Sequence, residues 1–323
     1  MNQLWMTTLA LLIESLVGYP PALQGAIGHP VQWMGKLITF LDEGLNDEAA
    51  TPSSNRLNGI IALVILILCA ALPAAVLAYA LAHIPYGWVL NVLLATTLIA
   101  QKSLADHVSD VGQALSQSLP AARAAVSKIV GRDPAALDEK GVTKAALESL
   151  AENAADGVVA PIFWYALLGL PGLAAYKAIN TADSMIGHRS EKYIDFGWAS
   201  ARLDDLVNLP ASRLTGLLFA GAARLKGADA MKASWAAMWR DAKKHQSPNA
   251  GWPEAAMAGA LGFSFGGPRT YHGEVVDLPT MGDGREPQTA SDIAEGLSLF
   301  RNAMTLLLLV AAALALIPWG RVL

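Results

Sequence analysis

Long apolar stretches alternate along this chain with polar stretches that carry most of its charges. Residues 57–82 are long enough for a membrane-spanning helix, which takes about 20 residues, and residues 86–100 follow after a tight link. This pattern predicts an all-α polytopic membrane protein, a single domain over residues 1–323, with helical polar loops. The candidate membrane segments are residues 4–17, 57–82, 86–100, 158–176, 206–223 and 304–318.

The segment 158–176 is interrupted by Gly169-Leu170-Pro171-Gly172, a poor middle for a simple span. Most basic residues lie in the polar segments 23–56, 101–157 and 224–301, which are therefore expected on the cytoplasmic side. A full crossing by 158–176 would place the basic loop 177–205 on the opposite side. A re-entrant hairpin, buried in protein, would return the loop to the cytoplasmic side, and it is the alternative that we favour.

Composition and charge fit a membrane protein and exclude several other classes. The chain is 54% hydrophobic and 15% charged, whereas soluble domains average about 25% charged residues. Its net charge of −4 and the absence of a basic run with interleaved aromatic residues predict no nucleic-acid partner. The single cysteine excludes an internal disulfide, and the N-terminal sequence lacks the features of a cleaved signal peptide.

The densest cluster of charged and amide residues lies between Lys144 and Arg213. On a helix, Lys144, Glu148, Glu152 and Asp156 share one face, and Gly157 is expected to end that helix. Carboxylates four residues apart repel each other by about 0.2–0.5 kcal/mol per pair, so the row suggests a cation such as Mg²⁺. A solvated acidic face is the alternative interpretation.

The second half of this stretch adds basic groups, amides and further carboxylates within a few turns. Each has a structural alternative: Asn180 and Asp183 could cap a turn, and Asp204 and Asp205 could begin a helix. Arg202 could anchor the chain at the membrane interface. Farther on, the glycine-rich segment 247–273 contains Arg269 but no Walker A, GxGxxG or kinase pattern.

Seven long motifs, in this order, resemble the CobD/CbiB family of cobalamin biosynthesis over nearly the whole chain. They are HPVQWMGKLI, KSLADH, IVGRDP, ESLAENAADGVVAP, YKAINTADSMIGHR, DFGWASARLDD and SPNAGWPEAAMAGALGFSFGGPRTYHG. The resemblance implies an enzyme of the bacterial inner membrane with its site on the cytoplasmic side. The implied reaction is ATP-dependent amide formation between adenosylcobyric acid, a cobalt corrinoid, and an amino alcohol phosphate. Tyr19 and Gln32 depart from the residues expected in this family.

The implied reaction needs carboxylates for Mg²⁺, basic groups for phosphates, and a base for the amine proton. For Mg²⁺ we assign Glu148, Glu152, Asp156 and Asp183. For substrates and their phosphates we assign Lys177, Asn180, Arg189, Arg202, Arg269 and Asn153. The candidates for the base are His188, Asp204 and Asp205.

Two other classes of function stay open at this stage. A membrane transporter of a corrinoid or small solute would use broken helices such as the one at Gly169, although no inverted repeat is visible. A scaffold for other cobalamin enzymes would need no polar constellation. The partners that we expect are the bilayer, the two substrates and, for the enzyme, other proteins of the pathway.

Overall fold

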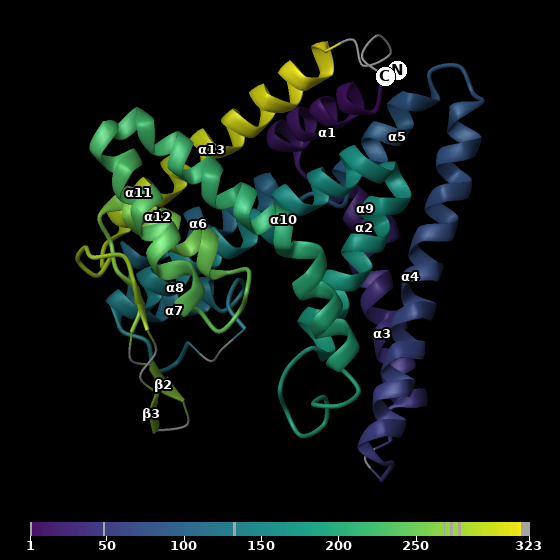
Figure 1. Cartoon of the computed structure of the whole chain (residues 1–323), viewed down its shortest axis with the longest axis horizontal. Coiled ribbons are helices and arrows are strands. Elements are labelled where there is room, and N and C mark those ends of the chain that lie inside the picture. The colour runs from purple at the N-terminus through teal and green to yellow at the C-terminus, as the bar shows by residue number, and fades with distance from the viewer. Residues whose placement is uncertain are drawn as a thin grey trace. The chain divides into compact units, whose positions relative to one another are not determined.

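The computed structural model describes residues 2–47, 49–131, 134–267, 269–271, 274–276 and 279–317 (Figure 1). Helices make up almost all of its regular structure, which confirms the predicted all-α class. The long helices are α1 (Gln3–Val17), α3 (Pro30–Leu45), α4 (Pro52–Ala82), α5 (Gly87–Thr96), α6 (Gln101–Leu115), α8 (Glu139–Ala154), α9 (Ala160–Ile186), α10 (Trp198–Ala222), α11 (Ala228–Asp241), α12 (Gly251–Leu261) and α13 (Ala290–Leu316).

The remaining elements are short. They are α2 (Pro21–Ile27), α7 (Leu119–Val126), the π-helical turn η1 (Ala155–Val159) and the 3₁₀ turns η2 (Ala223–Lys226) and η3 (Ala242–Lys244). Two antiparallel strand pairs, which the sequence did not predict, join β1 (Phe265–Gly266) to β4 (Thr280–Met281) and β2 (Arg269–Tyr271) to β3 (Glu274–Val276).

Among the described residues, four helical stretches are long and apolar enough to cross a membrane. They are Pro52–Ala82, Gly87–Leu115, Glu139–Ile186 and Ala290–Leu316, and the bent pair Gln3–Val17 and Ala22–Leu45 would make a fifth. These stretches overlap five of the six candidate segments. The sixth, 206–223, lies in α10, which is outside this set, so its insertion stays a prediction.

The described residues form two compact units. One unit takes them from Met1–Ala100, Ala160–Asn208 and Ala311–Leu323, and the other from Gln101–Val159 and Leu209–Val310. Each unit is built from several separate segments of the chain, so neither is a continuous stretch of sequence. In the first unit, the long helix α4 packs on α3 and α9 (Figure 1). Their shared core includes Ile38, Leu63, Leu66, Ile179 and Ile186.

A sharp bend at Gly169 divides α9 into two arms. Gly169 has φ 65° and ψ −157°, a backbone conformation that favours glycine. A Cβ placed on Gly172 would stand 2.9 Å from the carbonyl oxygen of Trp164. Residues eight apart in a straight helix are separated by about 12 Å along its axis, so this contact requires the bend. The interruption read from the sequence is therefore real, while a re-entrant path through a membrane stays a prediction.

The expectation that Gly157 ends a helix is wrong. The helix α8 passes into the π turn η1, which contains Asp156 and Gly157, and α9 follows at Ala160. Glycine ends helices when it takes a left-handed conformation, and Gly157 has no positive φ. Val158 and Val159 are fully buried, so the chain continues its buried surface across the glycine. Asp156 consequently sits in a widened turn inside the chain of helices rather than at an end.

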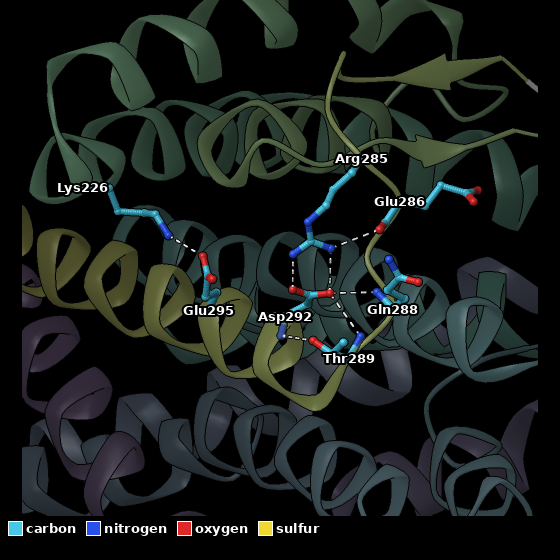
Figure 2. A network of polar contacts seen from close by, with 7 residues as sticks. All are labelled: Lys226, Arg285, Glu286, Gln288, Thr289, Asp292 and Glu295. Carbon is cyan, nitrogen blue, oxygen red and sulfur yellow. Dashed lines mark hydrogen bonds and ion pairs between the residues drawn. The ribbon is translucent and has the colours of Figure 1, made fainter.

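In the second unit, α13 begins with a capping box. The Asp292 backbone N–H donates to Thr289 Oγ1 at 3.2 Å, and Asp292 Oδ2 accepts from the Thr289 N–H at 3.1 Å. Asp292 also pairs with the fork of Arg285 through both carboxylate oxygens (Figure 2). One turn farther, Glu295 pairs with Lys226 across the surface. A buried acid and an exposed acid thus stand side by side on one helix.

We expect Asp292→Ala to lower the free energy of unfolding by about 1–3 kcal/mol, because Arg285 and two backbone N–H groups lose their acceptor. The control Glu295→Ala breaks a pair whose side chains are 44% and 37% exposed, and should change stability by less than about 1 kcal/mol. Thermal unfolding of the two purified variants in detergent measures both. Equal losses would mean that burial of Asp292 adds nothing.

Candidate functional site

A ladder of polar side chains connects the second arm of α9 to α10 in the first unit. Lys177 Nζ donates to Asn180 Oδ1 at 3.1 Å, and Asn180 Nδ2 donates to Asp204 Oδ1 at 3.4 Å. Asn208 Nδ2 donates to the other oxygen of Asp204 at 2.9 Å. The Tyr176 hydroxyl donates to Asn208 Oδ1 at 2.9 Å and completes the ladder. The structure therefore brings Lys177, Asn180 and Asp204 together, as a shared site requires.

Asp204 contributes the carboxyl group of this ladder, and its pKa is shifted. Its side chain is buried, and burial together with the nearby Asp183 carboxylate raises its pKa to about 7. Burial also raises the pKa of Asp205, while the charges of Arg202 and Arg189 act in the opposite direction. A carboxyl with a pKa near 7 can take up or release a proton at neutral pH. Of the proposed bases, Asp204 is thus the best suited; His188 is exposed in the loop after α9.

Asp183 lies one turn before the end of α9, and its carboxylate folds over Gly187. A Cβ on Gly187 would stand 2.1 Å from Asp183 Oδ1 and 2.6 Å from the Asp183 carbonyl oxygen. Any larger residue at 187 would therefore displace the carboxylate or the end of the helix. Gly187 is part of the arrangement that holds Asp183, although the sequence alone did not single it out.

The loop 187–197, which carries His188 and Arg189, is fixed to α3 and α4. Lys192 Nζ lies 2.7 Å from Asp42 Oδ2, and the Tyr193 hydroxyl donates to the same oxygen at 3.0 Å. Arg56 Nε donates to Asp195 Oδ1 at 2.9 Å. The loop thus lies with the polar segment between α3 and α4. The two were expected on one side of the membrane, and their contact is consistent with that expectation.

The two N-terminal departures from the family pattern build the turn before α3. The Tyr19 hydroxyl donates to the Gly28 carbonyl at 2.7 Å, and Tyr19 packs on His29 with ring centroids 4.5 Å apart. Gln32 Oε1 accepts from the His29 N–H, and His29 Nδ1 accepts from the Val31 N–H. His29 is therefore the N-cap residue of α3, and it also lies within electrostatic reach of Lys177.

The predicted carboxylate row lies on α8 and η1 in the second unit. Glu148 is buried and accepts from the Gly266 backbone N–H at 2.9 Å, while Lys144 Nζ donates to the Gly266 carbonyl at 2.9 Å. Glu152 is exposed and Asp156 is half-buried. Asn153 Nδ2 donates to the Ser149 carbonyl at 2.9 Å. The pair Lys144 and Glu148 therefore holds the glycine-rich segment in place.

Within the described ranges, no three His, Cys, Asp or Glu side chains gather closely enough to hold a metal ion by themselves. Asp183 lies in the first unit and Glu148, Glu152 and Asp156 in the second. The metal assignment therefore stays a prediction. Arg269 lies in β2, and its side chain is outside the part of the chain that the structure describes.

The first unit also contains an apolar cavity of about 290 Å³. It is lined from α3, α4, the end of α5 and the second arm of α9. Its lining is apolar apart from Thr97 and the thiol of Cys69. Phosphate-bearing substrates need charged groups, and none lines this cavity, so the ladder around Asp204 is the better candidate for the reactive site.

The fold and this ladder define a helical membrane protein with a buried carboxyl group and a lysine in one polar ladder. The family model described as CobD/Cbib protein matches residues 7–300. Three relatives, each named cobalamin biosynthesis protein CobD, come from Sinorhizobium sp, Rhodobacter capsulatus and Brucella suis. The Sinorhizobium protein is 50% identical over 97% of this chain and 98% of its own length. The Rhodobacter capsulatus protein is 48% identical over 98% of this chain and 99% of its own, and the Brucella suis protein is 48% identical over 97% of both. No solved structure matches the chain.

The chain belongs to the CobD/CbiB family, and its role lies in cobalamin biosynthesis. The motif resemblance noted in the sequence is thereby confirmed. The structure adds three residues that the sequence did not single out: Tyr176, Gly187 and Asn208. Asn208 could have been found, since it follows Asp204 by four residues on one face of a helix. The contact between Gly187 and the Asp183 carboxylate has no such signal, because it depends on a side-chain rotamer.

We assigned Asp183 to Mg²⁺ in the implied amide-forming reaction. We therefore expect Gly187→Ala to lower the rate of amide formation by at least tenfold, because the new methyl group displaces the Asp183 carboxylate. Overpacking of this kind also costs about 1–3 kcal/mol of stability. The control Gly44→Ala lies in α3, where a Cβ meets nothing within 4 Å, and should leave activity unchanged. Steady-state rates and thermal unfolding of both variants test this. Full activity in Gly187→Ala would show that the position of Asp183 does not matter.

The pKa of Asp204 predicts a pH dependence of stability. The folded protein keeps the proton up to about pH 7, whereas the unfolded chain releases it near pH 4. Between these values the folded state binds more protons, so stability falls as pH rises, by a few kcal/mol in total. We expect Asp204→Asn to remove this component. Melting temperatures at pH 5 and pH 8 measure it, with the exposed Asp110→Asn as the control, and identical slopes in all three proteins would contradict the assignment.

Proposed function

We propose that this protein is an ATP-dependent ligase. It joins adenosylcobyric acid to (R)-1-aminopropan-2-yl phosphate, or a related amino alcohol phosphate, and gives adenosylcobinamide phosphate. Membership in a family of cobalamin biosynthesis proteins supports the pathway. The observation that carries the proposal is the buried Asp204 carboxylate, held by two amides within a ladder that ends at Lys177.

The chemistry requires that a carboxylate oxygen first becomes a leaving group. An oxygen of the corrinoid carboxylate attacks the γ-phosphorus of ATP, the bond between the γ-phosphorus and the bridging oxygen breaks, and ADP leaves. The amine nitrogen then attacks the carbonyl carbon of the acyl phosphate, and inorganic phosphate leaves as the amide bond forms. The amine must lose a proton for this attack, and Asp204 is the group that we assign to accept it.

Lys177 supplies the positive charge nearest to Asp204 along the ladder. Its ammonium group is held by Asn180, so it is oriented before any substrate arrives. A fixed cation beside the base can hold a phosphate oxygen while the amine is deprotonated. Arg189 and Arg202 lie close enough to influence Asp205 and add to the positive charge of this region. We assign all three to phosphate binding.

The donor set of the first unit fits Mg²⁺. This ion is usually held by one or two carboxylates together with substrate phosphates and water, rather than by a cage of protein ligands. Asp183 supplies such a carboxylate, and the charge that it exerts on Asp204 is the repulsion that a cation would relieve. When bound, Mg²⁺ neutralises phosphate charge. We place the site on the cytoplasmic face of the inner membrane, where ATP is available.

Purified full-length protein, incubated with both substrates, ATP and Mg²⁺, should give the amide product and one ADP per product by mass spectrometry. We expect Asp204→Asn to reduce kcat by about 10²–10⁴, the usual contribution of a general base. Asp110→Asn, which neutralises an exposed carboxylate on α6, should retain full activity.

Absence of product with the wild-type protein would reject the ligase. Substrate-dependent flux into proteoliposomes without chemical change would instead support a transporter, the function that the bend in α9 also suits. Neither product nor flux would favour a scaffold. Full activity in Asp204→Asn would leave the ligase in place but remove Asp204 as its base.

A further inference from the structure

Arg213 differs from Arg240 and Arg285, two other arginines of the second unit, in the charge of its hydrogen-bond partners. Its guanidinium is half-buried on α10. Its hydrogen bonds go to three neutral oxygens: the Leu209 carbonyl at 3.2 Å, the Ser212 hydroxyl at 2.9 Å and Asn249 Oδ1 at 2.7 Å. No carboxylate of the described residues pairs with it. A cation that is partly withdrawn from water without a counter-charge is costly, and an anion would relieve that cost.

The hydrogen bonds of Arg213 leave one edge of its guanidinium available. All three start from Nη1, and neither Nε nor Nη2 has a hydrogen-bond partner within the described part of the chain. The two N–H groups on that edge form the parallel fork that binds two oxygens of a phosphate or carboxylate at once. The protein therefore uses one nitrogen to fix the group and presents the others.

An aromatic ring packs against the face of the Arg213 guanidinium and helps to fix its orientation. The Arg213 Cζ lies 4.8 Å from the ring centroid of Trp252, which is 6% exposed and lies in the first turn of α12. A cation over the face of an indole is attracted by the negative charge of the ring face. Ser212 and Asn249 are themselves joined by a 3.0 Å hydrogen bond. The fork is thus preorganised on a rigid support.

Two other arginines of the same unit show what a purely structural role looks like. Arg240 is paired with Asp241 and Asp283, and Arg285 is paired with Asp292. Their forks are neutralised by carboxylates that the chain itself supplies. Arg213 therefore differs from these two arginines in having no carboxylate partner among the described residues. Arg123 also donates to a neutral carbonyl, that of Leu137, but through the single nitrogen Nε.

We infer that Arg213, supported by Trp252 and Asn249, forms a binding site for a phosphate group. Two sources share this chemistry. One is a phosphate-bearing substrate, either the amino alcohol phosphate or ATP, and this identification rests on the proposed function. The other is the phosphate of a lipid headgroup. The ring of Trp239 lies 5.1 Å from that of buried Trp252 and 5.9 Å from that of Trp235, measured between centroids. Trp239 and Trp235 are exposed, and exposed tryptophans are typical of a membrane interface.

Binding to the full-length protein tests the site without requiring turnover. The probes are inorganic phosphate, phosphoethanolamine as a minimal amino alcohol phosphate, ATP, and nanodiscs with or without phosphatidylglycerol. We expect Arg213→Gln to raise the Kd of at least one probe by tenfold or more. Arg213→Lys should lie between this variant and the wild type, because it keeps the charge but loses the fork. The probe that responds most strongly identifies the source.

The matched control is Arg224→Gln, which removes an exposed arginine just beyond the end of α10 and should leave every Kd within twofold. The inference is overturned if the wild type binds no probe, or if Arg213→Gln and Arg224→Gln weaken binding equally. If Arg213→Gln does not fold, Arg213→Lys decides, and an unchanged Kd rejects the site. If amide still forms and Arg213→Gln leaves the phosphate affinity unchanged, this site is rejected and the ligase is retained. If phosphate binds but no amide product forms, the ligase is rejected and this site is retained.

Discussion

The contact that organises the first unit is the buried carboxylate of Asp204 between α9 and α10. A carboxylate removed from water is expensive unless hydrogen bonds or charges compensate for it. Here each oxygen accepts one amide N–H, from Asn180 and from Asn208, and no arginine or lysine among the described residues donates to it. Neutral donors hold the group in place without forcing it to ionise, which keeps its pKa high enough for proton exchange. A direct salt bridge would have fixed the two helices as firmly and removed that property.

The surroundings of this ladder are built from close backbone contacts. A Cβ on Gly197 would stand 1.7 Å from the Ile186 carbonyl oxygen, and one on Gly59 would stand 1.9 Å from that of Phe196. Glycine is therefore required at both positions for the loop 187–197 to close over the end of α9 and the side of α4. The ion pairs of that loop with α3 and α4 then fix its register. Packing through glycine and pairing through charge serve one purpose, which is to hold Asp183 and Arg189 near the start of α10.

Much of the fold was predictable because its signals are local. Helical class, the apolar segments and the interruption at Gly169 follow from composition and from glycine and proline chemistry. Gly157 misled for the same reason: a glycine ends a helix only when its backbone becomes left-handed, and burial of Val158 and Val159 favours continuation instead. The partners of Asp204 were partly predictable, since Asn208 lies one turn away. The partner of Glu148 was not, because Gly266 is 118 residues distant and donates through its backbone.

In the second unit, charged residues differ in whether an opposite charge within the described part of the chain pairs with them. Asp241 and Asp292 are almost fully buried, and each is saturated by arginine and backbone donors, so their ionised forms are stabilised and their exchange with a ligand is disfavoured. Arg213 receives the same degree of positioning but only neutral acceptors. Three neutral acceptors and the ring of Trp252 fix the guanidinium of Arg213, and no described carboxylate balances its charge. The difference is explained if the compensating anion belongs to a ligand, because a site that already contained its own carboxylate would have to exchange it for each phosphate that arrives.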